Sequence, residues 1–262
     1  MTVLLASRNL RDLGGIPTPS GDRIAPGRLF RSGQLADLDD AEREVLVGLA
    51  LTTIVDLRRE DEIQRLPTPD LGARTVHISP NHGTSEFAVQ AAAIAEGRDT
   101  HVDPDAFPRG YRQMAIDPYR IERYRDVVLT LITDHHQPVL FHCTAGKDRT
   151  GWTAALVLSL AGVDRDTITD DYLRTNEIRS EHNAVVVERY RTTLAERRGA
   201  DVDDVSETDL AAIRSLVEVR ADYLDQAFAG VEETYGSFDT YRRDALGIDD
   251  ATVAAFRAAI LV

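Results

Sequence analysis

The sequence predicts an α/β fold in which a central, mostly parallel sheet is flanked by helices. Three observations lead to this prediction. Short apolar runs typical of buried strands recur in the first 142 residues, segments with helical periodicity and many Asp and Glu residues separate them, and the pattern after about residue 165 is almost entirely helical. Strands that alternate with helices in this way form βαβ units, whose strands run parallel.

Four segments are predicted as strands. They are Arg28–Phe30, Thr53–Leu57, Thr75–Ser79 and Val139–His142. The segment before the last strand has an apolar stripe at helical spacing, which we expect in the core; its members are Tyr124, Val127, Val128, Leu131 and Ile132. Beyond the loop that follows the last strand, Thr150–Ala161 is apolar nearly all round, as a fully buried helix is.

The C-terminal part, about residues 165–262, is predicted to be helical and to support the sheet. The expected helices are Ile178–Arg198, Glu207–Ala229, Phe238–Leu246 and Ala251–Leu261, the last of them capped by Asp249 and Asp250. No repeat, low-complexity tract or linker interrupts the pattern. We therefore expect residues 1–262 to form a single domain.

The composition limits the partners that the chain can have. Its 44 acidic and 30 basic residues give a net charge of −14, which argues against binding of nucleic acid and against docking by a polybasic surface. The longest apolar run, near residues 152–163, is too short to span a bilayer, and the apolar start of the chain lacks the basic residues of a signal peptide. We expect a cytoplasmic protein without stable membrane insertion, and its oligomeric state stays open.

One decapeptide contains both the single cysteine and the single lysine of the chain. It reads His142-Cys-Thr-Ala-Gly-Lys-Asp-Arg-Thr-Gly151. A lone cysteine is most often a small buried apolar residue. Here, however, Arg149 follows Cys143 by six positions, between a predicted strand and a predicted helix N-terminus. Such a loop turns main-chain N–H groups inward, where they and the helix dipole favour an anion. The spacing indicates a thiolate that attacks a bound phosphate.

Each residue of this loop has an expected role. The main-chain N–H groups of Thr144, Ala145 and Gly146 contribute to a phosphate cradle, and Gly146 allows the tight turn. Arg149 grips two phosphate oxygens with its planar guanidinium. Thiols beside cations and helix N-termini ionise readily, so Cys143 attacks phosphorus in line and forms a phosphocysteine that water hydrolyses.

The neighbouring residues leave alternatives open. Thr150 donates a hydrogen bond to the sulfur, caps the helix, or does both. His142 is expected to brace the loop rather than to exchange a proton. The general acid that protonates the leaving oxygen is Asp148, inside the loop, or Asp56, near the end of a predicted strand. Lys147 is expected to add a second cation beside the phosphate.

Other kinds of site fit these residues less well. A nucleotide-binding P-loop needs Ser or Thr where Asp148 follows Lys147. A zinc site needs clustered Cys or His, and the seven histidines are scattered. We expect neither a metal nor a cofactor, because the loop N–H groups and Arg149 stabilise the charge. A non-catalytic phosphate-binding module would have no use for a reactive thiol, and a sulfur carrier would not require the spacing from Cys143 to Arg149.

The decapeptide resembles the signature loop of the bacterial tyrosine phosphatase family. Three further segments resemble the motifs of that family in order and spacing: Asn9–Gly15, Arg31–Gly33 and Ile54–Arg59. The stretches Asp171–Asn176 and Tyr235–Ser237 also look familial. The resemblance therefore spans nearly the whole chain, and it implies the cysteine-phosphatase fold.

The resemblance also implies roles for particular residues. Cys143 corresponds to the nucleophile, Arg149 to the phosphate clamp and Asp148 to the acid, while Arg11 and Arg58, together with Asp56, lie in familial motifs and are expected to bind substrate. The family covers its site with a mobile helical lid, which matches about residues 83–116 here. We expect Phe87, Phe107 and Tyr111 in that segment to line the pocket mouth or to pack between helices.

The substrate class follows from the same resemblance. Family members accept phosphotyrosine, phosphoserine or phosphothreonine, and phosphoinositides, so the expected substrate is a phosphorylated protein or a phosphoinositide. We expect a protein tyrosine phosphatase with dual specificity and phosphoinositide activity. The alternative is a dedicated phosphoinositide phosphatase, because Lys147 resembles a lysine in the loops of such enzymes. Some members are exported without an evident signal peptide, so export stays open as well.

Overall fold

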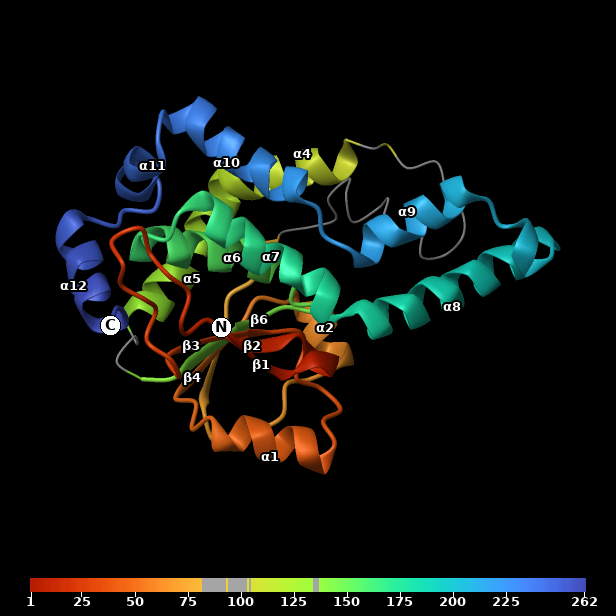
Figure 1. Ribbon diagram of the computed structural model, residues 1–262, viewed down its shortest axis with the longest axis horizontal. Coiled ribbons are helices and arrows are strands. Elements are labelled where there is room, and N and C mark those ends of the chain that lie inside the picture. The colour runs from red at the N-terminus through yellow and green to blue at the C-terminus, as the bar shows by residue number, and fades with distance from the viewer. Residues whose placement is uncertain (82–92, 94–102, 104, 134–136) are drawn as a thin grey trace.

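A six-stranded sheet with the strand order β1-β2-β3-β6-β4-β5 lies at the centre of the computed structural model (Figure 1). The structure describes residues 1–81, 93, 103, 105–133 and 137–262. The strands are β1 Thr2–Leu5, β2 Leu10–Asp12, β3 Leu29–Ser32, β4 Thr53–Asp56, β5 Arg74–His77 and β6 Val139–His142. β3, β6, β4 and β5 run parallel to one another, which confirms the predicted, mostly parallel sheet.

The first two strands are antiparallel additions that the sequence pattern did not predict. β1 pairs with β2, and β2 pairs with β3. β2 is three residues long and includes Arg11 and Asp12, so it lacks the apolar run by which a buried strand is recognised. Both side chains are nevertheless buried, because their polar atoms bond to groups elsewhere in the chain.

The parallel strands end together at one edge of the sheet. Ser32 of β3 and Asp56 of β4 are both in register with His142, the last residue of β6. Open α/β sheets bind ligands outside the carboxyl ends of their strands. The loop that begins with Cys143 leaves β6 at this edge, and so the fold places the decapeptide where a ligand site is expected.

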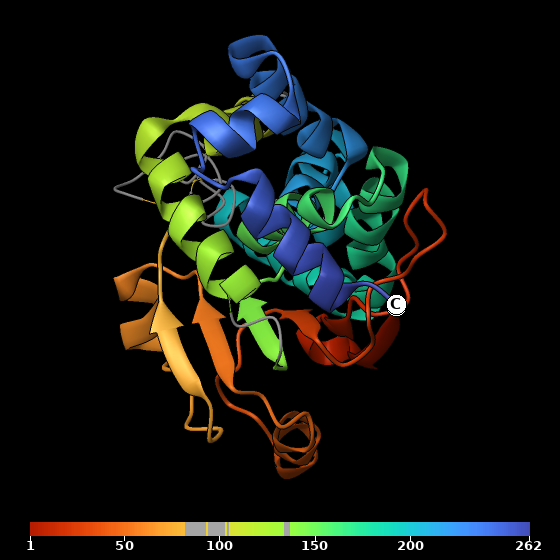
Figure 2. The same ribbon diagram turned by 90° about the vertical axis from the view of Figure 1, so that its left-hand side faces the viewer.

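Helices cover the two faces of the sheet unequally (Figures 1 and 2). α1, Asp40–Gly48, covers one face over a small apolar cluster that includes Phe30, Ile54 and Leu140. The larger core lies on the other face, where it includes Val55, Val139 and residues of several helices. The helices after α1 are α2 Glu60–Arg65, α4 Ala106–Ile116, α5 Pro118–Thr133, α6 Asp148–Ala161, α7 Arg165–Ile178, α8 Ser180–Arg198, α9 Glu207–Val217, α10 Ala221–Tyr235, α11 Phe238–Asp244 and α12 Asp250–Ile260.

The helices around the decapeptide agree with the sequence prediction. All five residues of the apolar stripe in α5 are buried. α6 begins at Asp148, two residues before the predicted start, and its Trp152 is 0% exposed. α12 is capped by Asp249, whose carboxylate accepts the N–H of Thr252 at 2.8 Å.

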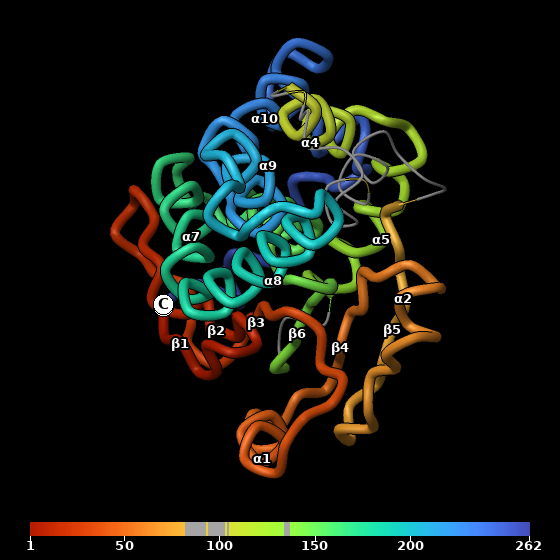
Figure 3. Tube along the Cα trace, turned by 90° about the vertical axis from the view of Figure 1, so that its right-hand side faces the viewer, coloured from red at the N-terminus to blue at the C-terminus, as the bar shows by residue number. Residues whose placement is uncertain are grey.

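The C-terminal helices differ from the prediction at two points. The predicted helix Glu207–Ala229 is two helices, α9 and α10, because Glu218 and Arg220 are extended and the side chain of Asn176 bonds to both the N–H and the C=O of Val219. The predicted helix from Ile178 to Arg198 likewise starts only at Ser180, where α8 follows α7. α8 and α9 share an apolar cluster of their own, which includes Leu194 and Ile213, and they extend from the rest of the molecule (Figures 1 and 3).

The predicted lid, about residues 83–116, lies largely outside the described residues. Its last part is α4, which lies against α10 (Figures 1 and 3). Phe107 and Tyr111 of α4 are 2% and 1% exposed, so of the two expectations the packing between helices is the one observed. Phe87 lies outside the described residues. In the described part of the chain, no helix is both long enough and apolar enough to cross a membrane.

Candidate active site

The loop between β6 and α6 is a ring of unpaired main-chain donors. Cys143 lies at its start and is 2% exposed. Within the described part of the chain, the N–H groups of residues 144–150 donate no hydrogen bond, while the N–H of Gly151 bonds to the C=O of Lys147 at 2.8 Å. Because these donors precede a helix of fourteen residues, the helix dipole adds positive potential at the same place. The loop can therefore hold an anion next to the sulfur.

Gly146 is required in this loop for two reasons. Its φ is +70°, a conformation that other residues adopt only with strain. A Cβ at this position would also lie 2.5 Å from the C=O oxygen of Ser32. The loop is thus pressed against the end of β3, which leaves no room for a side chain.

Buried charges hold the loop on the side that faces the N-terminal strands. We call this side the back of the loop and define it by the residues Asn9, Arg11, Arg31 and Asp171. The C=O of Gly146 accepts Asn9 Nδ2 and Arg31 Nη2, both at 3.0 Å. Arg31 Nη1 in turn bonds to Asp171 Oδ2 at 2.5 Å. Burial raises the pKa of Asp171, but the charges of Arg11 and Arg31 outweigh this effect and lower it. The sequence reasoning missed Asp171 as a support of the site, although it lies in a familial stretch.

Arg11 and Arg58 do not face the loop as the sequence analysis expected. Arg11 Nε bonds to Asp171 Oδ1 at 2.9 Å, and its Nη1 bonds to Asn9 Oδ1 at 2.6 Å. Arg58 Nη2 bonds to Asp56 Oδ2 at 2.7 Å. Both guanidinium groups are 0% exposed and paired with carboxylates, so their geometry assigns them to bracing the fold rather than to contact with a substrate.

Asp56 is also engaged away from the loop. Its carboxylate accepts hydrogen bonds from Arg58 Nε and from the hydroxyl of Thr68. It also lies 3.5 Å from His142 Nε2. Burial raises the pKa of Asp56, but the charges of His142 and Arg58 outweigh this effect and lower it to about 2. His142 Nδ1 contacts the C=O of Cys143 at 3.2 Å, as a residue that braces the loop would. Asp56 is therefore a poor source of a proton at neutral pH.

Arg149 is held by a carboxylate that the sequence reasoning missed. Its Nη1 and Nη2 bond to the two carboxylate oxygens of Glu62 in α2, at 2.7 and 2.9 Å. Nη1 also bonds to the C=O of Leu57, and Nη2 to the hydroxyl of Thr144. In the described structure only Nε of Arg149 is without an acceptor. Burial raises the pKa of Glu62, but its bonds with Arg149 and Thr144 outweigh this effect and lower it to about 2.

Asp148 accepts a hydrogen bond from a chain of two buried phenols. Tyr111 of α4 donates to Asp148 Oδ1 at 2.6 Å, and Tyr172 of α7 donates to the Tyr111 oxygen at 2.6 Å. Burial, followed by the charge of Asp148, raises the pKa of both phenols well above the usual value. They therefore remain protonated donors, and Oδ2 of Asp148 has no hydrogen bond within the described residues. Only the position of Tyr111 inside the predicted lid could have suggested this contact from the sequence.

The ammonium of Lys147 is bonded to main-chain carbonyls at the end of α9. It bonds to the C=O of Leu216 at 2.7 Å and to the C=O of Glu218 at 3.2 Å. It also lies 3.7 Å from Asp148 Oδ1. Burial is the main cause that lowers its pKa. Lys147, expected as a second cation beside the phosphate, is thus bonded to main-chain carbonyls in this structure.

Thr150 does not have one of its two expected roles, that of the helix cap. It is the third residue of α6, whose N-cap is Lys147, so its side chain is not the helix cap. Its hydroxyl is buried and has no hydrogen-bond partner in the described structure. A buried hydroxyl without a partner is uncommon, which marks Thr150 as a donor that a ligand or the sulfur can use. No cluster of three or more His, Cys, Asp or Glu residues suited to a metal is found among the described residues.

Comparisons with known sequences identify relatives of this chain. A model of the tyrosine phosphatase family matches residues 3–262. The triple specificity protein phosphatase PtpB of Mycobacterium tuberculosis is 35% identical over 278 aligned positions, which cover 97% of this chain and 96% of PtpB. A tyrosine-protein phosphatase of Nostoc commune is 33% identical over 60% of this chain and 51% of its own. Among solved structures, the kinase associated phosphatase with serine in place of its catalytic-site cysteine is 14% identical, with a TM-score of 0.33 over 58% of this chain and 86% of that one.

These matches extend far beyond the loop. The family model includes all the segments whose motifs suggested the resemblance, from Asn9–Gly15 to Tyr235–Ser237. The alignment with PtpB covers almost the whole length of both proteins. From the strands that precede the loop to the helices that follow it, the chain belongs to the tyrosine phosphatase family.

Proposed function

We propose that this protein is a cysteine-dependent phosphatase that hydrolyses phosphotyrosine through a phosphocysteine intermediate. One observation carries the proposal most directly: the sulfur of Cys143 lies at the start of a loop whose N–H groups from residue 144 to residue 150 are unpaired in the described structure. Such a ring binds a tetrahedral dianion and stabilises the charge that develops on its oxygens during attack.

In the first step, the thiolate of Cys143 attacks phosphorus in line with the leaving oxygen. The S–P bond forms while the P–O bond to the substrate breaks, and the electron pair of that bond stays on the leaving oxygen. Asp148 donates a proton to this oxygen. The loop N–H groups and Nε of Arg149 stabilise the equatorial oxygens, while Glu62 fixes the plane of the guanidinium.

The contacts of the two candidate acids favour Asp148 over Asp56. Asp56 is 1% exposed and bonded to Arg58, whereas the side chain of Asp148 is 21% exposed at the start of α6. Tyr111 donates to Oδ1 of Asp148, so that oxygen is an acceptor and the proton of the acid is carried by Oδ2. The pair of phenols thus selects the oxygen from which the proton is donated.

In the second step, water attacks the phosphocysteine. Asp148, now ionised, takes a proton from the water, the O–P bond forms, and the S–P bond breaks to return the thiolate and release phosphate. The unpaired hydroxyl of Thr150 can donate to the sulfur as it leaves. Every atom of the released phosphate and of the dephosphorylated product comes from the substrate or from water. No metal or cofactor takes part in the scheme.

The proposed substrates are phosphorylated proteins, phosphotyrosine first, with further activity on phosphoserine, phosphothreonine and phosphoinositides. The similarity to PtpB, whose name describes a triple specificity protein phosphatase, supports a broad range. A dedicated phosphoinositide phosphatase is less favoured than the sequence suggested, because the ammonium of Lys147 bonds to main-chain carbonyls of residues 216 and 218. A preference above about a hundredfold in kcat/KM for soluble inositol lipids over phosphotyrosine peptides would reverse this order.

Hydrolysis of p-nitrophenyl phosphate by wild type and Cys143→Ser, with EDTA present throughout, tests the proposal. We expect turnover in wild type and none in the variant, because serine cannot form the thiolate. Folding of the variant is checked by circular dichroism. No turnover in folded wild type, or turnover that survives the substitution, would contradict the proposed mechanism.

A further inference from the structure

Arg179 is a buried arginine whose side chain has no partner in the described structure. It joins α7 to α8, as the C-cap of the first helix and the N-cap of the second. The residue is 9% exposed, and its Nε is buried without a hydrogen bond. Nor does any described carboxylate or carbonyl accept from its two terminal nitrogens. A charged group taken out of water in this way costs free energy unless an anion compensates it.

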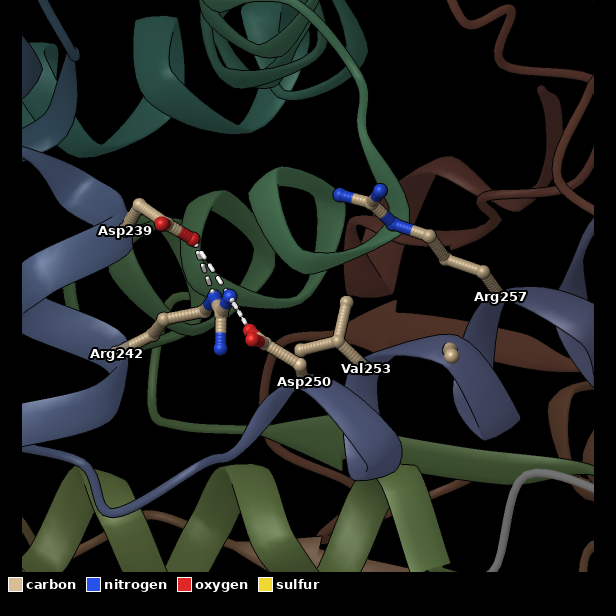
Figure 4. Close-up of a pocket in the computed structure, with 6 residues that line it drawn as sticks. Asp239, Arg242, Asp250, Val253 and Arg257 are labelled. Atoms are coloured by element: carbon tan, nitrogen blue, oxygen red, sulfur yellow. Dashed lines mark hydrogen bonds and ion pairs between the residues drawn. The ribbon is translucent and has the colours of Figure 1, made fainter.

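The other buried arginines of the described chain are all paired with carboxylates. Arg11 and Arg31 share Asp171, and Arg58 bonds to Asp56. Arg242, which is 7% exposed, lies between the carboxylates of Asp239 and Asp250 (Figure 4). The buried arginines of the described chain are Arg11, Arg31, Arg58, Arg179 and Arg242. Arg179 is thus the exception within this set, and its missing partner calls for an explanation.

The charges that act on Arg179 are those of the active site. Burial lowers the pKa of its guanidinium, and the negative charges of Cys143 and Asp148 raise it. In the same way, the positive charge of Arg179 contributes to the lowered pKa of Lys147. The contacts agree with a position beside the active site. The C=O of Arg179 accepts the N–H of Asn183, one turn later, and Asn183 Nδ2 bonds to the C=O of Val217 at 3.2 Å. The carbonyls on either side of Val217 accept the ammonium of Lys147, so the turn that begins at Arg179 lies next to this loop residue.

The charge balance around the loop leaves a role for one more cation. Arg149 is neutralised by Glu62, with only its Nε left to donate. Lys147 bonds to two carbonyls and lies beside Asp148. A bound phosphoryl dianion next to the thiolate adds further negative charge. Within the described part of the chain, Arg179 has all its donors available and no competing carboxylate.

We propose that Arg179 is a second phosphate-binding arginine of this site, whose guanidinium donates to the nonbridging oxygens of the phosphoryl group that Cys143 attacks. The phosphoryl group lies between the nucleophile and the proton donor, which are the two groups whose charges act on Arg179. The planar fork suits two oxygens of one phosphoryl group. This inference rests on the proposed function, and it transfers to Arg179 the role that the sequence suggested for Lys147.

Binding of inorganic phosphate tests the inference without any turnover. Calorimetric titration is carried out on wild type, Arg179→Gln, Arg179→Lys and the control Arg174→Gln, an exposed arginine on the preceding helix. We expect the dissociation constant to rise at least about tenfold in Arg179→Gln, which is about 1.4 kcal/mol, and less in Arg179→Lys. Arg174→Gln should stay within about twofold. An unchanged constant in Arg179→Gln would overturn the inference.

Unfolding in urea separates a binding role from a structural one. If Arg179 is held ready for an anion, Arg179→Gln without phosphate is at least as stable as wild type, because the uncompensated charge is gone. At the same phosphate concentration, the urea midpoint of wild type should then rise by more than that of the variant. A variant that is markedly less stable than wild type without phosphate would assign Arg179 to structure and would overturn the inference.

The outcomes also separate this inference from the proposed function. If wild type binds phosphate through Arg179 but does not hydrolyse p-nitrophenyl phosphate, the inference stands and the enzymatic function fails. In another outcome, wild type is active, and Arg179→Gln loses activity only on substrates with a second anionic group while its dissociation constant for phosphate is unchanged. Arg179 would then bind that second anionic group of the substrate. That result would overturn the inference and leave the function intact.

Discussion

The two sides of the loop are built in opposite ways. At the back, Asn9, Arg11, Arg31 and Asp171 bond to one another and to the C=O of Gly146, and the charged groups are paired. We call the side that presents Cys143 and Asp148 the front of the loop. There, no partner in the described structure is found for the N–H groups of the loop, for the hydroxyl of Thr150 or for the guanidinium of Arg179. The back fixes the shape of the loop, and the front keeps its donors available for a ligand.

This contrast predicts different consequences for the same type of substitution. At the back, loss of one charged partner leaves another buried charge alone, and the damage is to stability. At the front, the damage is to chemistry or binding, and stability stays nearly constant. Rates of front variants and stabilities of back variants can therefore break or sharpen the comparison.

The largest effect is expected at the front, from Asp148→Asn. An amide cannot donate the acid proton, so kcat should fall by about 10²–10⁴-fold for aryl phosphates with poor leaving groups and much less for good ones. Asp56→Asn should instead lower kcat equally for all leaving groups, through a disturbed sheet edge. Rates for a series of leaving groups distinguish the two. A flat response of Asp148→Asn across the series would show that another group supplies the proton.

The largest effect at the back is expected from Asp171→Asn. The substitution leaves the buried guanidinium groups of Arg11 and Arg31 without a counter-charge, and it should lower the free energy of unfolding by about 3–5 kcal/mol. Its neighbour Asp170 is exposed, and Asp170→Asn should change stability by less than about 0.5 kcal/mol. Urea unfolding of both variants gives the comparison. Equal stabilities would mean that the pairing at the back contributes little.

A smaller effect is expected from the two phenols that connect Asp148 to α4 and α7. Tyr111→Phe removes the donor to Asp148 Oδ1, so the acid proton can reside on either carboxyl oxygen. We expect kcat to fall about tenfold for substrates with poor leaving groups. Tyr172→Phe should have a weaker effect, because Tyr172 donates only to Tyr111. The stability cost should be about 1 kcal/mol. Tyr241→Phe is the control, since its buried hydroxyl has no partner. An unchanged kcat in Tyr111→Phe would reduce the phenol pair to packing.

The smallest effect concerns acid stability. The pKa of Glu62 is about 2 in the folded protein and lies below its ordinary value of 4.5, so its contribution to stability is present above that value and is lost as the pH falls toward 2. Glu62→Gln cannot lose a charge in this range. Urea midpoints measured from about pH 6 to pH 3 should therefore fall less steeply in the variant than in wild type. Parallel curves would contradict the assignment.

The parts of the site that are local in sequence could be predicted, and the long-range pairs could not. The strand, the loop and the helix from Val139 to Ala161 follow from apolar runs and the spacing of Cys143 and Arg149. Glu62, however, is 87 residues from Arg149, and no periodicity connects them. Arginine residues in motifs, such as Arg11 and Arg58, look like phosphate ligands until the carboxylates that pair with them are located.

The fold could be predicted to a similar extent. Apolar runs located β3, β4 and β6, because strands buried on both faces are rich in apolar residues. β5, at the edge of the sheet, was predicted as well, although it is largely exposed. The short antiparallel strands were missed, since β2 carries polar residues whose partners lie elsewhere. The break between α9 and α10 was missed too, because Val219 is held by the side chain of Asn176, 43 residues earlier. In both cases the deciding contact is tertiary.

The unpaired N–H of Thr144, described above as part of the phosphate cradle, has a second consequence, for oxidation. The chain has no other thiol, so a sulfenic acid formed on Cys143 cannot be resolved as an internal disulfide. A main-chain nitrogen that is adjacent and not hydrogen-bonded can attack that sulfur instead, forming an S–N bond and releasing water. The same arrangement that admits phosphate would then protect the sulfur from further oxidation until a reductant reopens the ring.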